Sequence, residues 1–147
     1  MLTGCGMMPA NDTEILGRIE MLALAAGERI MRIRAEGCAV HAKADESPVT
    51  QADREAEIII LDGLRTAFPD IPVVAEEEVA AGQSPASVGD TFFLVDPLDG
   101  TREFISGNGD FTVNIALVRD GIPAIGVVYA PVRSLLYAGG GGRAEEI

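Results

Sequence analysis

One stretch of the sequence decides the fold: FTVNIALVRDGIPAIGVVY, residues 111–129. In its first half every second residue is apolar, and the apolar set is Phe111, Val113, Ile115 and Leu117. Such alternation is typical of a strand with one buried face, so Thr112 and Asn114 are expected to face water. Asp120-Gly121 is the signature of a tight hairpin turn, after which the chain returns along residues 122–129. The stretch therefore predicts an antiparallel β-hairpin.

Elements on both sides of this hairpin complete the prediction. Apolar residues recur at helical spacing from Glu14, with Asn11 and Glu14 as a capping box, and the pattern closes at Gly37. A second helix is predicted from Thr50 to near Phe68, with Thr50 and Asp53 as an acidic variant of a capping box. Further strands are predicted at Ile71–Ala75, Thr91–Val95 and Ser134–Tyr137.

Two helices followed by an antiparallel meander indicate an α+β fold. Residues 1–10 are expected to be a loose start, and residues 11–147 a single domain.

The composition limits the partners that this chain can have. The formal net charge of −12 over 147 residues argues against nucleic acid or an anionic membrane surface. No stretch approaches the roughly 20 apolar residues of a transmembrane helix, and no export signal is recognisable. Cys5 and Cys38 lack metal-ligand spacing and His41 is the only histidine, so no zinc site is predicted. We expect a soluble, cytoplasmic protein with reduced thiols.

Three carboxylates follow apolar runs where strands are expected to end. Asp96 directly follows Val95, Asp99 comes three residues later, and Glu76 follows the run that ends at Ala75. If the two strands are neighbours, the carboxylates converge, and the carbonyl of Leu98 could join them as a neutral ligand. Hard divalent cations such as Mg²⁺ prefer oxygen ligands of this kind. Two ions that share a bridging carboxylate can activate water and hold a phosphate oxygen.

Simpler explanations compete with a metal site. Glu76–Glu78, taken alone, is most often a solvated acidic run. A turn chosen for its backbone geometry explains Asp99 and Gly100, but it leaves Asp96 unexplained. Aspartyl-phosphate phosphatases carry DxDGT, whereas here the aspartates are three apart, a spacing expected to turn the second carboxylate to a different side. The parallel, helix-alternating pattern of those enzymes is also missing.

The segment DPLDGTREFISGNGDFTVNIALV, residues 96–118, closely resembles the signature of the inositol monophosphatase superfamily, the metal-dependent, lithium-sensitive phosphatases. The Arg-Glu-Phe after DPLDGT is similar to the CysQ-type 3′(2′),5′-bisphosphate nucleotidases, as are SPVTQAD, DGLRTAFPDIPVVAEEE and GVVYAPV. Inositol monophosphatases proper usually read DGTTNF after the same aspartates. The resemblance runs from about Ile15 to Tyr137.

The resemblance implies a metal site in this chain. Glu76 matches the metal-binding glutamate, Asp96 the bridging aspartate, Leu98 the backbone-carbonyl ligand, and Asp99 the ligand of the second metal. The implied cofactor is Mg²⁺, with two or three ions per site, and Li⁺ is expected to inhibit.

The resemblance also implies catalytic and substrate-binding roles. Thr101 and Glu76 match the residues that position the attacking water, and Asp53 matches the aspartate that orients the threonine. Glu77 matches an acidic residue that lies next to the metal ligands without binding the metal itself. The positions that match contacts to the substrate phosphate are Glu76, Leu98, Asp99, Gly100 and Thr101.

The implied reaction is hydrolysis of adenosine 3′,5′-bisphosphate to AMP and phosphate, in sulfate assimilation. Water would attack the phosphorus in line, with no covalent phospho-enzyme. An inositol-1-monophosphatase-type activity is the alternative. The resemblance implies a cytoplasmic protein, with peripheral attachment to the cytoplasmic side of the inner membrane left open.

Members of the family are nearly twice as long, and their second half is an α/β domain that brings another aspartate to the metals. The present sequence ends at GGGGRAEEI, where the meander finishes. We therefore expect the first half of the family's αβαβα sandwich, with the second domain truncated. A metal-binding fragment without turnover and a half that acts only with a partner chain stay open as alternatives. A homo-oligomer is left open as well.

Overall fold

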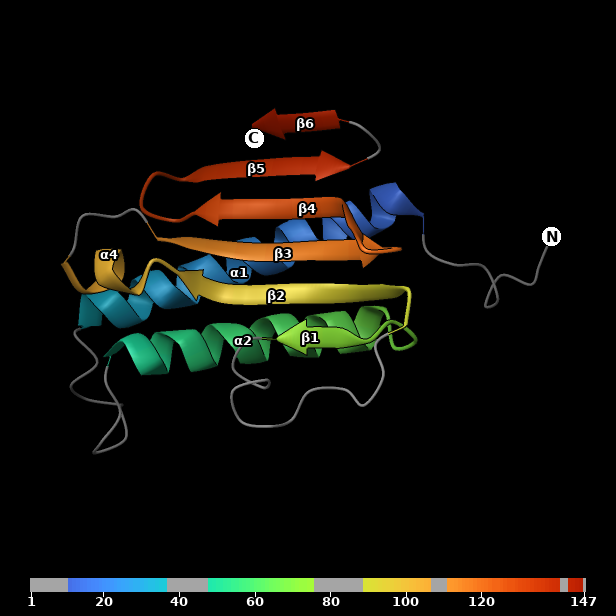
Figure 1. Ribbon diagram of the computed structural model, residues 1–147. Coiled ribbons are helices and arrows are strands. Elements are labelled where there is room, and N and C mark those ends of the chain that lie inside the picture. The colour runs from blue at the N-terminus through green and yellow to red at the C-terminus, as the bar shows by residue number, and fades with distance from the viewer. Residues whose placement is uncertain (1–10, 37–47, 76–88, 107–110, 141–142, 147) are drawn as a thin grey trace.

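The structure is a computed structural model, and it describes residues 11–36, 48–75, 89–106, 111–140 and 143–146. In this part of the chain two long helices lie against one face of a six-stranded sheet (Figure 1). The α+β prediction is therefore confirmed. The loose start predicted for residues 1–10 lies outside the described residues. Among the helices described, none is long and apolar enough to cross a membrane.

The first helix, α1 (Asp12–Glu36), begins with the predicted cap. The backbone N–H of Glu14 donates to Asn11 Oδ1 at 2.8 Å, which satisfies one of the N–H groups that a first turn leaves unpaired. One stripe of the helix is buried, and it consists of Ile15, Ile19, Ala23, Ala26, Gly27, Ile30 and Ile33.

The second helix, α2 (Pro48–Ala67), begins before the predicted Thr50. Proline fits the first helical position because its fixed φ suits a helix and its missing N–H would have no partner there. Thr50 and Asp53 therefore lie within the helix, and the predicted acidic capping box is wrong. Capping does not explain an aspartate at position 53.

Six strands form the sheet in the order of the sequence: β1 (Val73–Ala75), β2 (Thr91–Asp99), β3 (Thr112–Arg119), β4 (Ile122–Ala130), β5 (Leu135–Gly140) and β6 (Arg143–Glu146). The meander from β2 to β6 is antiparallel, as expected, but β1 pairs with β2 in parallel. A long connection joins β1 to β2, as a parallel pair requires. In the turn between β3 and β4, Asp120 and Gly121 have φ values of 52° and 77°, which suit the predicted hairpin.

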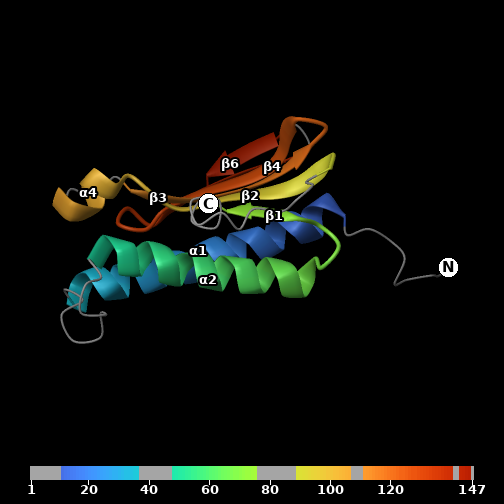
Figure 2. The ribbon, with the colours of Figure 1, turned by 60° about the horizontal axis from the view of Figure 1, so that its bottom comes forward.

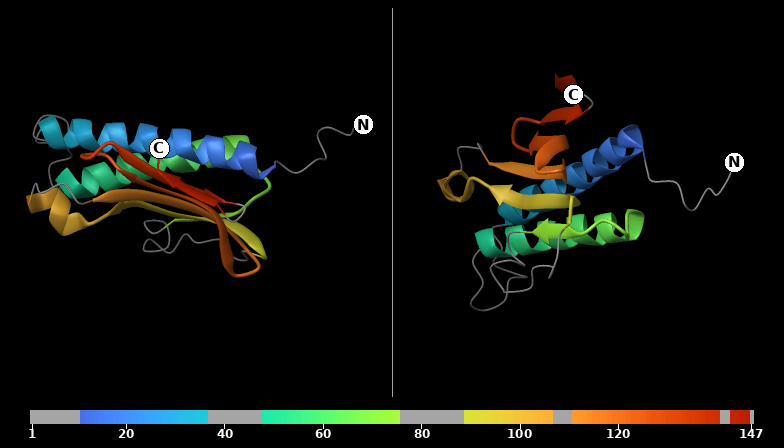
Figure 3. Two further views of the ribbon diagram at one scale, coloured as in Figure 1. Left: turned by 90° about the horizontal axis from the view of Figure 1, so that it is seen from above. Right: turned by 45° about the vertical axis from the view of Figure 1, so that its right-hand side comes forward.

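The core lies between the helices and the sheet (Figures 2 and 3). α1 packs against β3, β4 and β5, while α2 packs against β1 and β2. The sheet contributes Phe93, Val95, Val113, Ile115, Leu117, Ile125, Val127, Leu136 and Ala138, all of which are buried. No described element covers the other face of the sheet, which is called the open face below (Figure 2).

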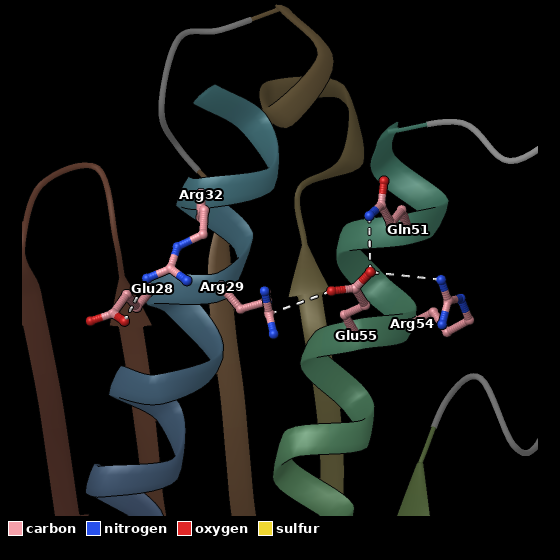
Figure 4. A network of polar contacts seen from close by, with 6 residues as sticks. All are labelled: Glu28, Arg29, Arg32, Gln51, Arg54 and Glu55. Atoms are coloured by element: carbon pink, nitrogen blue, oxygen red, sulfur yellow. Dashed lines mark hydrogen bonds and ion pairs between the residues drawn. The ribbon is translucent and has the colours of Figure 1, made fainter. Parts of the chain in front are cut away.

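Polar contacts join the two helices near Glu55 of α2 (Figure 4). Arg29 of α1 lies 3.4 Å from Glu55 Oε1 through its Nε. The side-chain amide of Gln51 donates to Glu55 Oε2 at 2.9 Å, and Arg54 lies 3.7 Å from the same oxygen. One carboxylate therefore links α1 to the start of α2.

Candidate active site

The DPLD segment, residues 96–99, contains an irregularity in β2. Asp96 pairs with Asn114 of β3, and Asp99 pairs with Thr112. β2 thus takes three steps where β3 takes two, which defines a β-bulge. The extra residue of a bulge is left out of the pairing between strands. Proline is tolerated at such a place because it has no N–H to contribute.

The bulge brings Asp96 and Asp99 to the same face of the sheet. On a regular strand, side chains three positions apart would point to opposite faces. Here the two aspartates pair with residues that are two positions apart on β3 and therefore share a face. Val113, between those partners, is buried toward the helices, so the aspartates lie on the open face. The expectation that a spacing of three separates the two carboxylates is wrong, because the bulge absorbs one residue.

Gly100 turns the chain from β2 into a short helix, α4 (Thr101–Ser106). Its φ of 100° lies in the region that glycine favours. The carbonyl of Gly100 accepts a hydrogen bond from the backbone N–H of Phe104 at 3.0 Å. Thr101, the first residue of α4, therefore follows the two aspartates after a single turn residue.

Arg34, in the last turn of α1, contacts the segment around α4. The sequence alone does not predict this contact. The guanidinium carbon of Arg34 lies 6.0 Å from the ring centroid of Phe104 and 5.4 Å from that of Phe111. The two rings pack edge to face with centroids 5.5 Å apart. A cation over two aromatic faces is attracted by both rings, so Arg34 ties α4 to α1. No spacing in the sequence signals a contact between such distant positions.

Asp53 lies on α2, which contacts both β2 and α4. Its side chain is half-buried. The oxygen Oδ1 is buried and accepts no hydrogen bond within the described residues, although Asp53 makes another contact of its own. The side chain of Thr101 is not among those described, so its pairing with Asp53 stays a prediction.

The remaining predicted residues, Glu76 and Glu77, lie outside the described residues. The last described residue of β1, Ala75, pairs with Val95 directly before Asp96. Within the described ranges, no three His, Cys, Asp or Glu side chains gather as a metal-binding group. The predicted ligand atoms on described residues are the carboxylates of Asp96 and Asp99 and the backbone carbonyl of Leu98, all of them oxygens, and oxygen ligands suit Mg²⁺.

Comparisons with known proteins extend this result. The model of the inositol monophosphatase family matches residues 11–145. The 3′(2′),5′-bisphosphate nucleotidase CysQ of Escherichia coli O157:H7 is 49% identical over 132 residues, which cover 88% of this chain and 53% of that protein. The chain spans about half the length of the curated relatives it matches.

Solved structures show the same fold. The structure of CysQ from Bacteroides thetaiotaomicron superposes with a TM-score of 0.74 at 39% identity, over 90% of this chain and 48% of that one. An inositol monophosphatase from Anabaena (Nostoc) sp. PCC 7120 gives 0.73 at 28% identity, over 92% and 46%. The fold and the family model agree, and the chain belongs to the inositol monophosphatase family.

Proposed function

We propose that this chain supplies the metal- and phosphate-binding part of an Mg²⁺-dependent 3′(2′),5′-bisphosphate nucleotidase, which hydrolyses adenosine 3′,5′-bisphosphate to AMP and phosphate in sulfur assimilation. The relative from E. coli O157:H7 carries the name of this activity and is 49% identical. The chain itself has a formal net charge of −12, so an anionic substrate needs a cation between it and the protein.

One observation carries the proposal: the bulge in β2. It places Asp96 and Asp99 on one face of the sheet, and it leaves one peptide unit between them out of the pairing. Two carboxylates on one open face repel each other unless a cation lies between them. In this proposal Asp96 and Asp99 hold Mg²⁺, and Leu98 adds its backbone carbonyl.

The other residues complete the proposed site. Glu76 follows Ala75, whose partner Val95 precedes Asp96, and this register supports its role as a further ligand with Glu77 beside it. Bound Mg²⁺ would lower the pKa of a water molecule and neutralise charge on the phosphate. Gly100 and Thr101 would contact the phosphate through backbone and hydroxyl donors. Asp53 would accept a hydrogen bond from the hydroxyl of Thr101 and so orient it.

The test places this chain in a complete enzyme. Its residues 11–145 replace the aligned segment of the E. coli relative, and phosphate release is measured with Mg²⁺ and adenosine 3′,5′-bisphosphate. We expect turnover, and we expect Asp96→Asn to lower kcat/KM by at least about 100-fold, because even a residue that only supports a metal ligand contributes 10–100-fold. Asp62→Asn, at an exposed position on α2, is the matched control.

Two results would contradict the proposal. Near-normal turnover of the Asp96→Asn chimera would remove the metal assignment. Faster hydrolysis of inositol 1-phosphate than of adenosine 3′,5′-bisphosphate would replace the nucleotide activity with that of an inositol monophosphatase.

A further inference from the structure

Two polar side chains stand on the open face of β3, directly across from the aspartates. The side-chain amide of Asn114 donates to Thr112 Oγ1 at 3.1 Å, and both residues are half-buried. Asn114 is the partner of Asp96, and Thr112 is the partner of Asp99. Directly opposite residues on antiparallel strands bring their Cβ atoms to about 4.5–5.5 Å, within reach of a side-chain hydrogen bond.

General exposure to water does not explain why these two positions are polar. Leu94 of β2, Val128 of β4 and Tyr137 of β5 lie on the same face, and these apolar side chains are 48%, 39% and 45% exposed. Ala116 follows Asn114 on the same face of β3, and Val128 is the partner of Asn114 on β4. Among the described residues on this face of β3, the polar side chains are thus those that oppose the carboxylates.

After the hydrogen bond between them, Thr112 and Asn114 each keep a further side-chain donor. The hydroxyl of Thr112 accepts from Asn114, so its own proton is left to donate. The amide of Asn114 has a second N–H after the one that it gives to Thr112. Each of these donors lies on the strand next to a carboxylate, and a carboxylate accepts such bonds in its charged form.

We propose that Thr112 and Asn114 are positioning residues for the metal site, with Thr112 orienting the carboxylate of Asp99 and Asn114 that of Asp96. The inference rests on the proposed function, because it takes these carboxylates to be the ligands. Asp99 is exposed, and its side chain would otherwise sample several rotamers. Donors fixed on a neighbouring strand hold the oxygens in place before the cation arrives.

The test measures metal affinity in the 147-residue chain by isothermal titration with Mn²⁺, a probe that needs no substrate. Thr112→Val removes the hydroxyl and keeps the shape, and Asn114→Leu removes the amide. We expect each to raise the Kd for Mn²⁺ by about 10-fold, at the lower end of the effect of residues that support metal ligands. Thr112→Ser, which keeps the hydroxyl, should bind within about 3-fold of the parent chain.

Thr91→Val is the matched control, because it makes the same change at the far end of β2, where Thr91 pairs with Arg119. Thermal melting of each variant separates a loss of metal affinity from a loss of fold. An unchanged Kd in both Thr112→Val and Asn114→Leu would overturn the inference and leave the metal site intact. If the parent chain binds no Mn²⁺, the metal site of the proposed function fails, and the inference fails with it.

Discussion

At Gly27, α1 lies so close to the sheet that a methyl group would not fit. A Cβ built at this position would overlap the ring of Tyr129 on β4 and lie 3.1 Å from Pro131 Cγ. At Gly17, on the same helix, a Cβ would meet nothing within 4 Å. Gly27 is therefore required by close packing and Gly17 is not, although both are glycines inside the same helix.

We expect Gly27→Ala to lower the free energy of unfolding by about 1–3 kcal/mol, as overpacking of a core does. Gly17→Ala should raise it by about 0.5–1 kcal/mol, because alanine loses less conformational entropy than glycine in a helix. Urea unfolding followed by circular dichroism compares the two variants with the parent. A Gly27→Ala variant as stable as Gly17→Ala would show that Tyr129 does not restrict α1.

Asp12 and Arg119 join the start of α1 to the end of β3. The two guanidinium nitrogens of Arg119 lie 2.6 and 3.2 Å from the two carboxylate oxygens of Asp12. The hydrogen bond from Arg119 holds the pKa of Asp12 below its usual value of 3.8, and the same bond raises the pKa of Arg119. Because both side chains are exposed, the pair contributes at most about 1 kcal/mol.

The sign of this pKa shift predicts a pH dependence. The folded state favours the charged form of Asp12, so the stabilisation is fully present above the unfolded-state pKa, near 3.8. It is lost as the pH falls through the lower folded-state pKa. Asp12→Asn should therefore be less stable than the parent at pH 7 and equal to it at the acid end. Urea midpoints across this range test it, with exposed Asp70→Asn as control, and an unchanged gap at low pH would contradict it.

The sequence names the residues of the candidate site, and their roles stay predictions, but it does not predict how the residues are arranged. The motif predicts that Asp96 and Asp99 share one cation, because two carboxylates so close together need compensation. Their common face depends on the register with Thr112 and Asn114, and pairing between strands leaves no local mark in the sequence. For the same reason Thr112 and Asn114 were interpreted only as the solvent-facing side of a strand.

At the scale of the elements, the short helix α4 depends on a contact with α1. It has six residues, too few to be stable alone. Arg34 of α1 lies over the ring of Phe104 in α4 and over the ring of Phe111, which directly precedes β3. The position of Thr101 at the start of α4 therefore depends on an arginine far away in the sequence.

We expect Arg34→Ala to weaken α4 by about 1 kcal/mol, the size of a partly exposed cation–π contact. The amide of Phe104, which donates to Gly100, should then exchange its hydrogen about five-fold faster. Arg32→Ala is the control, since Arg32 pairs with Glu28 within α1. Hydrogen exchange followed by mass spectrometry measures both, and equal rates in the two variants would contradict the role of Arg34.

The sequence predicts the elements that have a clear periodicity, cap or turn signature, and it does not predict those that lack one. The periodicity of α1 and the cap at Asn11 are contained in one continuous stretch, as is the turn at Asp120-Gly121. The helix α4 is too short for a period to show, and β6, RAEE, has no apolar alternation. The parallel pairing of β1 with β2 depends on how a long connection returns, which no local pattern records.

At the scale of the whole molecule, the described helices cover one face of the sheet, and no described element covers the open face. We expect the 147-residue chain to bind an apolar dye and to associate in solution through this face, because exposed apolar side chains gather on it. Val128→Lys should reduce both. Met21→Lys, an exposed apolar position on α1, should change neither. Dye fluorescence and light scattering measure the effects, and equal behaviour of the two variants would contradict the assignment to this face.

The bulge in β2 also determines how this segment can vary in length. Deleting Leu98 would leave Asp96 and Asp99 two positions apart on a regular strand, where they would still share a face. The deletion would instead remove the peptide unit that strand pairing does not use. A homologous chain that lost this residue would keep both aspartates but lose the backbone carbonyl that strand pairing leaves unused. In an alignment, a gap at this point would thus mark chains that keep the two carboxylates without a third oxygen for the proposed metal site.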